Sequence, residues 1–231
     1  FILSTASLEF RNNARFIRTK SAKGTTFYIG DYVYSTPTQP SNKSGRQTPQ
    51  HIRFKDYSFW VTAKHLGLDT ATNKYAKIYL NRAEFLRAKC VHASNKSDLA
   101  LLITPTTFTN VMQKAEFIEK LSPLRTRAHM YGFGTHYHLD LFDPAVVHAV
   151  ISCEYYCLPK RSPKGASTKR FFIVDRMVDF GFSGGPVLTT DGKVLGMLSM
   201  SAYSRDSWAL RAKYILKAIK ELGIHPVSSK K

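Results

Sequence analysis

Residues 181–186 read Gly181-Phe182-Ser183-Gly184-Gly185-Pro186, and this stretch decides how the rest of the chain is interpreted. Apolar segments at 171–174 and 194–198 flank it, which predicts buried strands on both sides of a tight turn. Glycines beside a serine tolerate unusual backbone angles and leave backbone N–H groups uncovered. A hydroxyl that attacks a carbonyl group needs such N–H groups, because they stabilise the oxyanion that forms. The stretch therefore predicts a nucleophilic Ser183; the alternative is a glycine-rich hairpin with an incidental serine.

A nucleophilic serine needs a general base, and the base needs a group that orients it. Upstream of Ser183, Thr62-Ala63-Lys64-His65 ends an apolar segment whose composition predicts a strand. Asp98 stands at the start of Leu99-Ala100-Leu101-Leu102, a second strongly apolar segment. Because each polar residue lies at the end of an expected buried strand, a rigid core can bring His65 and Asp98 together with Ser183.

Taken in order, Thr62-Ala63-Lys64-His65, Asp98-Leu99-Ala100-Leu101-Leu102 and Gly181-Phe182-Ser183-Gly184-Gly185-Pro186 resemble the motifs of the trypsin/chymotrypsin-like serine proteases. The resemblance extends from about residue 57 to residue 201. It implies an all-β, chymotrypsin-like fold of two six-stranded antiparallel β-barrels with a C-terminal α-helix. It also implies a hydrolase, a serine endopeptidase that cleaves polypeptide substrates through a catalytic triad and an acyl-enzyme.

The same resemblance implies the catalytic roles. Ser183 attacks the scissile carbonyl, His65 takes the serine proton and later protonates the leaving amine, and Asp98 orients the imidazole. The backbone N–H groups of Gly181 and Ser183 form the oxyanion hole. The histidines at 136, 138 and 148 lack the cysteine pair or acidic helix that would support a metal site. Neither a metal ion nor a cofactor is therefore expected.

Further positions match substrate-binding residues of the family. Ser199 matches a serine that supports the aspartate, and Met200 and Ser201 match the segment that pairs with extended substrate backbone. Met177 matches the floor of the specificity pocket, so the substrate side chain at the cleaved bond is expected to be apolar or otherwise uncharged. Phe182 replaces an aspartate that zymogen-derived relatives use in an ion pair. Packing is therefore expected to hold the oxyanion turn.

The chain divides into three predicted segments. Residues 1–105 are expected to form the N-terminal barrel, which carries the histidine and the aspartate. Residues 106–123, with helical spacing of apolar positions, are expected to form the inter-barrel linker. Residues 124–231 are expected to form the C-terminal barrel, which carries the serine and ends in a helix over 208–222 with apolar residues at helical period.

Short β-like segments support this division. Asp191-Gly192 between two apolar pairs predicts a hairpin. Alternation and enrichment in β-branched and aromatic residues predict strands. The expected strands lie at 7–10, 15–18, 25–29, 31–34, 76–80, 84–93, 129–134, 146–158 and 171–174.

The chain is strongly basic, with 34 lysine and arginine residues against 16 acidic residues and a net charge of +18. Such a charge indicates RNA or another polyanion as a partner, and the clearest basic cluster lies at 160–170. No RNA-binding aromatic pattern accompanies the charge, so a solvated basic surface without a dedicated ligand is the alternative. No segment is apolar and long enough to predict a membrane span.

The three cysteines are Cys90, Cys153 and Cys157. Their odd number and irregular spacing argue against a disulfide framework, so they are interpreted as buried thiols rather than as metal ligands. Secreted relatives have a disulfide cysteine directly after the catalytic histidine, where this chain has Leu66. A reducing compartment, the cytoplasm, is therefore expected.

Two classes of function compete. The chain resembles the polyprotein-processing serine proteases of positive-strand RNA viruses in several features. It lacks the zymogen aspartate and a disulfide framework, its surface is basic, and it starts with neither an initiator methionine nor a signal peptide. Such an enzyme would cut its own polyprotein in the host cytoplasm, with RNA as a partner. A cellular or bacterial HtrA-like or toxin-like protease is the alternative within this class. The other class is a protease-like module that binds RNA without turnover; the complete catalytic set favours the enzyme.

Overall fold

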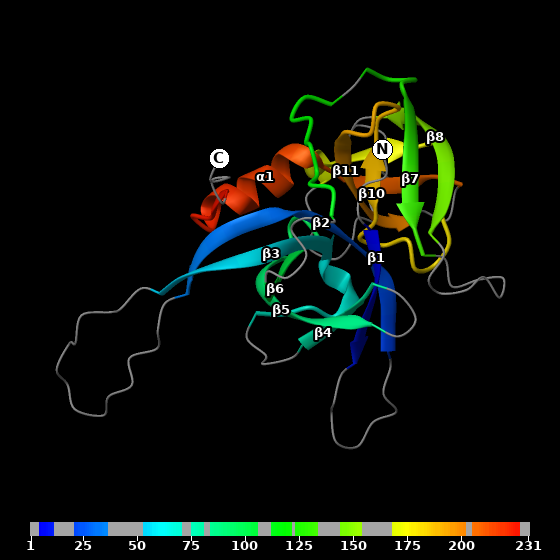
Figure 1. Ribbon diagram of the computed structural model, residues 1–231. Coiled ribbons are helices and arrows are strands. Elements are labelled where there is room, and N and C mark those ends of the chain that lie inside the picture. The colour runs from blue at the N-terminus through cyan, green and yellow to red at the C-terminus, as the bar shows by residue number, and fades with distance from the viewer. Residues whose placement is uncertain are drawn as a thin grey trace, which may run out of the picture.

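The computed structural model describes residues 5–11, 21–36, 53–70, 75–80, 84–105, 112–121, 123–133, 144–153, 168–201 and 205–226. Within these ranges the chain forms a curled β-sheet, a closed β-barrel and an α-helix near the C-terminus (Figure 1). The predicted all-β fold with a C-terminal helix is confirmed.

The curled sheet is built mainly from the N-terminal half of the chain, with the strand order β1-β4-β5-β6-β3-β2-β13. β1 pairs with both β4 and β2, so six of the strands close on themselves. The seventh strand comes from the C-terminal end of the chain and pairs with β2, an addition that the sequence did not predict. The strands are β1 (Thr5–Arg11), β2 (Ser21–Thr36), β3 (Arg53–Ala63), β4 (Tyr75–Tyr79), β5 (Phe85–Ser94), β6 (Leu99–Pro105) and β13 (His225–Pro226).

The closed barrel has the strand order β10-β11-β12-β9-β8-β7, which confirms a second six-stranded antiparallel barrel. The predicted hairpin at Asp191-Gly192 joins β10 to β11, and Gly192 has a φ of 85°, which glycine adopts without steric cost. The strands are β7 (Arg127–Gly132), β8 (Ala145–Cys153), β9 (Phe171–Val174), β10 (Pro186–Leu188), β11 (Val194–Ser201) and β12 (Ser207–Arg211).

The C-terminal helix α1 spans Ala212–Glu221, so the predicted start at residue 208 is wrong. Residues 207–211 form β12 instead. Ala209 faces the core inside the barrel, whereas Trp208 and Leu210 face the core shared with the first sheet. Consecutive side chains buried on opposite faces fit a strand, because side chains alternate across a sheet. At ten residues, α1 is too short to cross a bilayer, and no other described helix is long or apolar enough.

The described part of the predicted linker contains no helix. Residues 112–121 run beside the start of β11, where the Ile118 N–H donates to the Val194 carbonyl at 2.9 Å and the Val194 N–H donates to the Glu116 carbonyl at 2.7 Å. The helical spacing of apolar residues therefore does not produce a helix here, because the backbone groups of this segment form hydrogen bonds with β11. The expected strand at 15–18 and residues 106–111 lie outside the described residues.

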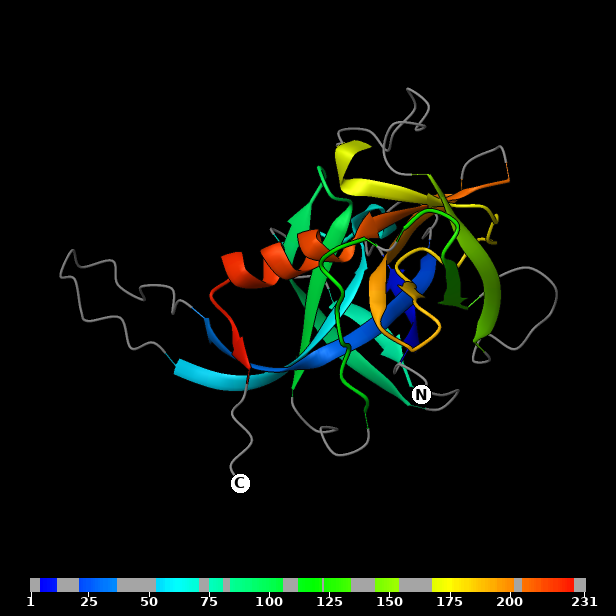
Figure 2. The same cartoon turned by 90° about the horizontal axis from the view of Figure 1, so that it is seen from above.

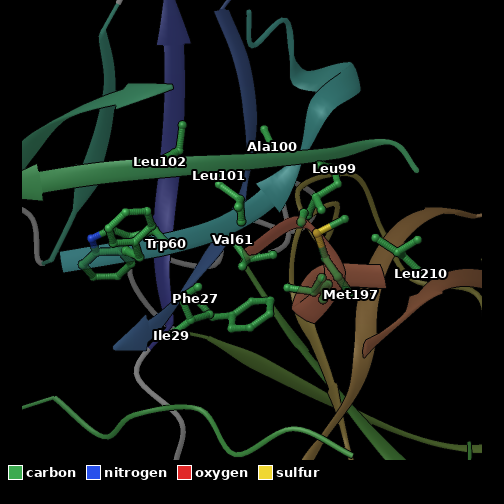
Figure 3. Packing of buried hydrophobic residues seen from close by; sticks show 14 of the residues in the cluster. Phe27, Ile29, Trp60, Val61, Leu99, Ala100, Leu101, Leu102, Met197 and Leu210 are labelled. Atoms are coloured by element: carbon green, nitrogen blue, oxygen red, sulfur yellow. The ribbon is translucent and has the colours of Figure 1, made fainter. Parts of the chain in front are cut away.

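The larger apolar core joins the two halves of the molecule. Phe27, Trp60 and Leu101 of the first sheet belong to the same cluster as Met197 and Leu210 of the barrel (Figure 3). The inner face of α1, which lies beside the first sheet in Figure 2, packs into this cluster. Fully burying a side chain of this kind stabilises the fold by about 1.5–3 kcal/mol. This packing fixes the position of the barrel relative to the sheet.

The cysteines differ from the prediction. Cys90 on β5 is a free, buried thiol, as expected. Cys153 at the end of β8 is buried but is disulfide-bonded, and its partner lies outside the described residues. The prediction of a free thiol is wrong for Cys153, because an odd number of cysteines still permits one bridge. Disulfides persist in oxidising compartments, so the cysteines no longer favour the cytoplasm.

Candidate active site

His65 lies on η1 (Lys64–Leu66), a single 3₁₀ turn that follows β3. Gly67 ends the turn in the left-handed region with a φ of 94°, and its N–H donates to the Lys64 carbonyl at 3.1 Å. The His65 side chain is 41% exposed. The imidazole is therefore held at the end of a rigid strand and is accessible from outside.

Asp98 lies on the turn that leads into β6, and its side chain is 4% exposed. Its φ of 48° is in the left-handed region, which aspartate tolerates better than most residues. The Asp98 carbonyl accepts the Lys64 N–H at 3.0 Å, and Oδ1 accepts the His65 N–H at 2.8 Å. Two backbone donors thus tie this turn to the turn that carries the histidine.

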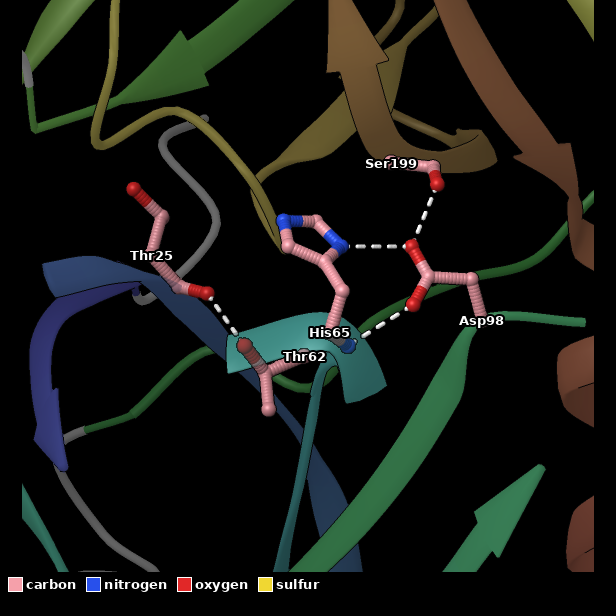
Figure 4. Close-up of polar contacts among 5 residues, drawn as sticks. All are labelled: Thr25, Thr62, His65, Asp98 and Ser199. Carbon is pink, nitrogen blue, oxygen red and sulfur yellow. Dashed lines mark hydrogen bonds and ion pairs between the residues drawn. The ribbon is translucent and has the colours of Figure 1, made fainter. Parts of the chain in front are cut away.

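The imidazole and the carboxylate meet directly. Nδ1 of His65 lies 2.7 Å from Oδ2 of Asp98, and the same oxygen accepts a 2.5 Å hydrogen bond from Oγ of Ser199 (Figure 4). Ser199 is fully buried on β11 of the barrel. The ring nitrogen that does not face Asp98 points away from the carboxylate (Figure 4). When Nδ1 donates its proton to the carboxylate, this second nitrogen is an acceptor in the neutral ring.

Ser183 lies on the glycine turn before β10, and its carbonyl accepts the Thr25 N–H at 2.8 Å. Gly184 has a φ of 89°. A Cβ atom at Gly184 would lie 2.1 Å from the Thr25 carbonyl oxygen and 2.3 Å from Oγ1 of Thr62. Only glycine allows the turn to dock so closely on β2 and β3. This docking brings Ser183 to the end of the strand that precedes His65.

Two backbone N–H groups and the hydroxyl of this turn have no partner among the described residues. Among the described residues, the Ser183 hydroxyl makes no hydrogen bond, either with His65 or with another group. The N–H groups of Gly181 and Ser183 also donate to no acceptor in that part of the chain. Uncommitted N–H groups beside a nucleophile are the requirement for an oxyanion hole. A serine–histidine hydrogen bond is often long in an enzyme without substrate.

Thr25 connects the two halves at the site, and the motifs did not indicate it. Its hydroxyl donates to the Gly181 carbonyl at 2.7 Å and accepts the Phe133 N–H at 3.0 Å. Its own carbonyl accepts the Thr62 hydroxyl at 2.7 Å (Figure 4). Thr62 belongs to the motif Thr62-Ala63-Lys64-His65, and its hydrogen bond to the Thr25 carbonyl explains why a threonine stands at that position. Thr25 has no local signal, because its partners lie far away in the sequence.

Phe182 packs as the sequence predicts. Its side chain is buried in the core inside the barrel. A Cβ atom at Gly132 would lie 2.6 Å from Cγ and Cδ1 of the Phe182 ring, so the missing side chain at Gly132 makes room for the phenyl group. Apolar packing therefore anchors the turn between Gly181 and Ser183.

The predicted substrate-binding residues lie in two places. Met177 is 56% exposed, on the loop before the glycine turn, so the structure does not place it at the floor of an enclosed pocket. Met200 and Ser201 lie at the end of β11, where their backbone pairs with β12. On the other side of β11, β10 reaches only to Met197. Leu198 bonds to Gly184 and Gly185 of the glycine turn, and beyond Leu198 no described strand pairs with this edge. The side chains of Met200 and Ser201 lie outside the described residues.

Other predicted features are only partly described. His136, His138 and the basic residues at 160–167 lie outside the described residues. His148 on β8 is packed edge-to-face against His129 on β7, with ring centroids 4.7 Å apart. Burial and the neighbouring His148 both lower the pKa of His129.

Comparison of the sequence with protein-family profiles and with curated proteins gives no match. The structure, in contrast, is similar to solved structures. The active form of the Rv3671c protease from M. tuberculosis has a TM-score of 0.62 and 18% sequence identity, covering 96% of this chain and 83% of that chain. Two inactive forms of the same protease, one of them a serine-to-alanine mutant, each have a TM-score of 0.61 and 16% sequence identity. Each alignment covers 94% of this chain, together with 89% of the first inactive form and 87% of the mutant. The chain therefore has a chymotrypsin-like protease fold.

Proposed function

We propose that this chain is a serine endopeptidase that uses Ser183, His65 and Asp98. The observation that carries the proposal is the 2.7 Å contact between His65 Nδ1 and Asp98 Oδ2, beside the glycine turn that presents Ser183. The carboxylate is buried while the imidazole is accessible, so the base is oriented from inside and acts on groups outside. The similarity of the fold to a protease supports the same activity.

In the first half of the reaction, Ser183 Oγ bonds to the scissile carbonyl carbon as its proton passes to Nε2 of His65. The carbonyl electron pair moves onto the oxygen, and the N–H groups of Gly181 and Ser183 stabilise the negative charge. Losing one such donor typically lowers the rate ~10²–10³-fold. The bond from carbon to nitrogen then breaks, and the imidazolium proton passes to the leaving amine. The acyl group remains on Ser183.

In the second half, water attacks the acyl carbon while His65 accepts one of its protons. The tetrahedral intermediate collapses, the carboxylic acid leaves, and the proton returns to Ser183. Asp98 acts in both halves, because it holds the tautomer with the proton on Nδ1 and stabilises the imidazolium. Ser199 is a positioning residue, since it acts through the carboxylate of Asp98.

The substrate is proposed to be an extended polypeptide. The edge of β11 beyond Leu198 has no strand neighbour in the described part of the chain, which supports backbone pairing at Met200 and Ser201. The loop before the nucleophile exposes two large apolar side chains, Met177 at 56% and Phe180 at 77%. An apolar or uncharged substrate residue at the cleaved bond stays a prediction from the sequence.

The similarity to the protease from M. tuberculosis supports a cellular or bacterial protease better than viral polyprotein processing. Polyprotein cleavage in cis, RNA as a partner and a cytoplasmic location stay predictions from the sequence. A module that binds RNA without turnover would not need the oriented His65–Asp98 pair, so this pair favours the enzyme.

Labelling with a fluorophosphonate probe tests the proposed activity, with the adduct located by mass spectrometry. Wild type is expected to carry one adduct on Ser183, and Ser183→Ala is expected to carry none. His65→Gln and Asp98→Asn are expected to slow labelling severely, by roughly 10⁴-fold where the tautomer is lost. Ser58→Ala and His148→Gln, two changes outside the site, should label at the wild-type rate. A folded wild type without an adduct, or an adduct that persists in Ser183→Ala, would overturn the proposal.

A further inference from the structure

A polar cavity of about 190 Å³ lies beside the turn that carries Asp98, between the first sheet, η3 (Thr168–Arg170) and α1. A water molecule occupies roughly 30 Å³ in the liquid, so the cavity has room for one tetrahedral oxyanion and a few waters. The charged and polar residues that line it include Lys96, Ser97, Arg170, Tyr214, Lys217 and Glu221.

The charge of the lining is positive. Lys96, Arg170 and Lys217 face a single carboxylate, Glu221. Lys217 Nζ lies 3.7 Å from Glu221 Oε1 in an exposed pair on α1. Lys96 and Arg170 make no ion pair with the described residues. Within the described part of the chain, two positive charges at the cavity therefore have no carboxylate partner.

Arg170 is fixed in place with most of its donors unused. Its Nη1 donates to Ser97 Oγ at 2.5 Å, and the guanidinium carbon lies 5.2 Å from the centre of the Tyr214 ring. A guanidinium has five N–H donors, and the bond to Ser97 is the one hydrogen bond that the Arg170 side chain makes with the described residues. A planar, oriented guanidinium with free donors matches the oxygens of a phosphate group in a bidentate contact.

We propose that this cavity binds a single phosphate-sized oxyanion, held by Arg170 with Lys96 and Lys217 at its mouth. Two unbalanced positive charges match a dianion better than a carboxylate. The volume has room for one phosphate group, so the proposed ligand is a small anion. None of these three residues belongs to the proposed catalytic set, although Ser97, which Arg170 contacts, directly precedes Asp98.

Calorimetric titration of the folded protein with inorganic phosphate, at constant ionic strength and neutral pH, tests the site. We expect saturable binding of one phosphate per chain. Arg170→Gln is expected to weaken binding roughly tenfold or more, because charge-assisted hydrogen bonds are lost. Lys120→Gln removes one positive charge from an exposed position outside the cavity and is the matched control, with wild-type affinity expected.

A second variant keeps the test informative when Arg170→Gln fails to fold. The double change Lys96→Gln and Lys217→Gln leaves the hydrogen bond between Arg170 and Ser97 intact and is expected to weaken phosphate binding as well. Absence of saturable binding to wild type overturns the proposal, as does an equal loss in Lys120→Gln.

A single-stranded oligonucleotide separates the two sources of phosphate. Binding of the oligonucleotide that depends on Arg170, without binding of inorganic phosphate, would replace the small-anion site with a nucleic-acid surface. All titrations can use Ser183→Ala, so their outcome is independent of the labelling of Ser183.

Discussion

The Thr25 hydroxyl donates a 2.7 Å hydrogen bond to the Gly181 carbonyl oxygen, 156 residues further along the chain. It also accepts the Phe133 N–H at 3.0 Å, so one side chain joins the first sheet to the glycine turn and to the end of β7. Thr25→Val keeps the shape and removes both bonds. We expect a loss of about 1–3 kcal/mol in the free energy of unfolding, because buried polar groups lose their partners. We also expect slower fluorophosphonate labelling of Ser183.

Thr26→Val is the matched control for this change. Thr26 is buried next to Thr25 and donates one hydrogen bond to the Val61 carbonyl at 2.9 Å, within the first sheet. Chemical denaturation should show a loss of stability for both variants, whereas only Thr25→Val should label slowly. Equal labelling rates would show that Thr25 serves stability alone.

Ser199→Ala removes the 2.5 Å hydrogen bond to Asp98 Oδ2 and leaves the contact between His65 and Asp98 in place. A neutral-to-charged hydrogen bond contributes about 1.5–3 kcal/mol, part of which orients the carboxylate. We therefore expect labelling of Ser183 to slow by roughly tenfold, with Ser199→Thr restoring part of the rate. Ser58→Ala is the control, because the Ser58 hydroxyl also donates to an aspartate, with 2.7 Å to Asp31 Oδ1. This bond joins β2 to β3 several residues away from His65 along β3. A loss of stability without a change in labelling would contradict the positioning role.

Gly184→Ala tests how closely the nucleophile turn is docked. Its Cβ atom would lie 2.1 Å from the Thr25 carbonyl oxygen, and the backbone there has a φ of 89°. Gly223→Ala has comparable backbone strain, with a φ of 63°, but no atom within 4 Å of the new Cβ. Left-handed strain alone costs roughly 1–2 kcal/mol. Thermal denaturation should show that amount for Gly223→Ala and a much larger loss for Gly184→Ala, together with loss of labelling at Ser183.

Burial raises the pKa of the Cys90 thiol from its ordinary 9.0 to about 11, against a smaller lowering by the backbone of His92. The native thiol is then protonated at mildly alkaline pH, and we expect iodoacetamide to modify it only after unfolding. Between pH 9 and 11 the unfolded chain releases this proton while the native chain keeps it, so the free energy of unfolding falls as pH rises. Urea denaturation across this range should show a smaller fall for Cys90→Ala. An equal fall in the free energy of unfolding of both proteins would contradict titration of the Cys90 thiol as its cause.

Local signals predicted much of the fold. Apolar alternation located the strands at 76–80 and 84–93 to within one residue at most ends, and Asp191-Gly192 marked its hairpin. These features depend on neighbours in the chain and on the backbone freedom of glycine. The predicted start of the C-terminal helix was wrong, because Leu210 continues the helical spacing of the residues that follow it. Residues 207–211 form a strand instead, and this depends on pairing with β9 and β11, which are distant in the sequence.

The sequence by itself determined that a histidine, an aspartate and a serine in a glycine turn stand at the ends of apolar strands, since residue type and strand pattern depend on neighbouring positions. Only the tertiary structure decided that Thr25 holds the Gly181 carbonyl, that Ser199 reaches Asp98 from the barrel, and that Arg170 lies against Ser97. These contacts join residues 73 to 156 positions apart. A hydrogen bond or a charge pair depends on distance in space, and the packing of the sheet against the barrel sets that distance.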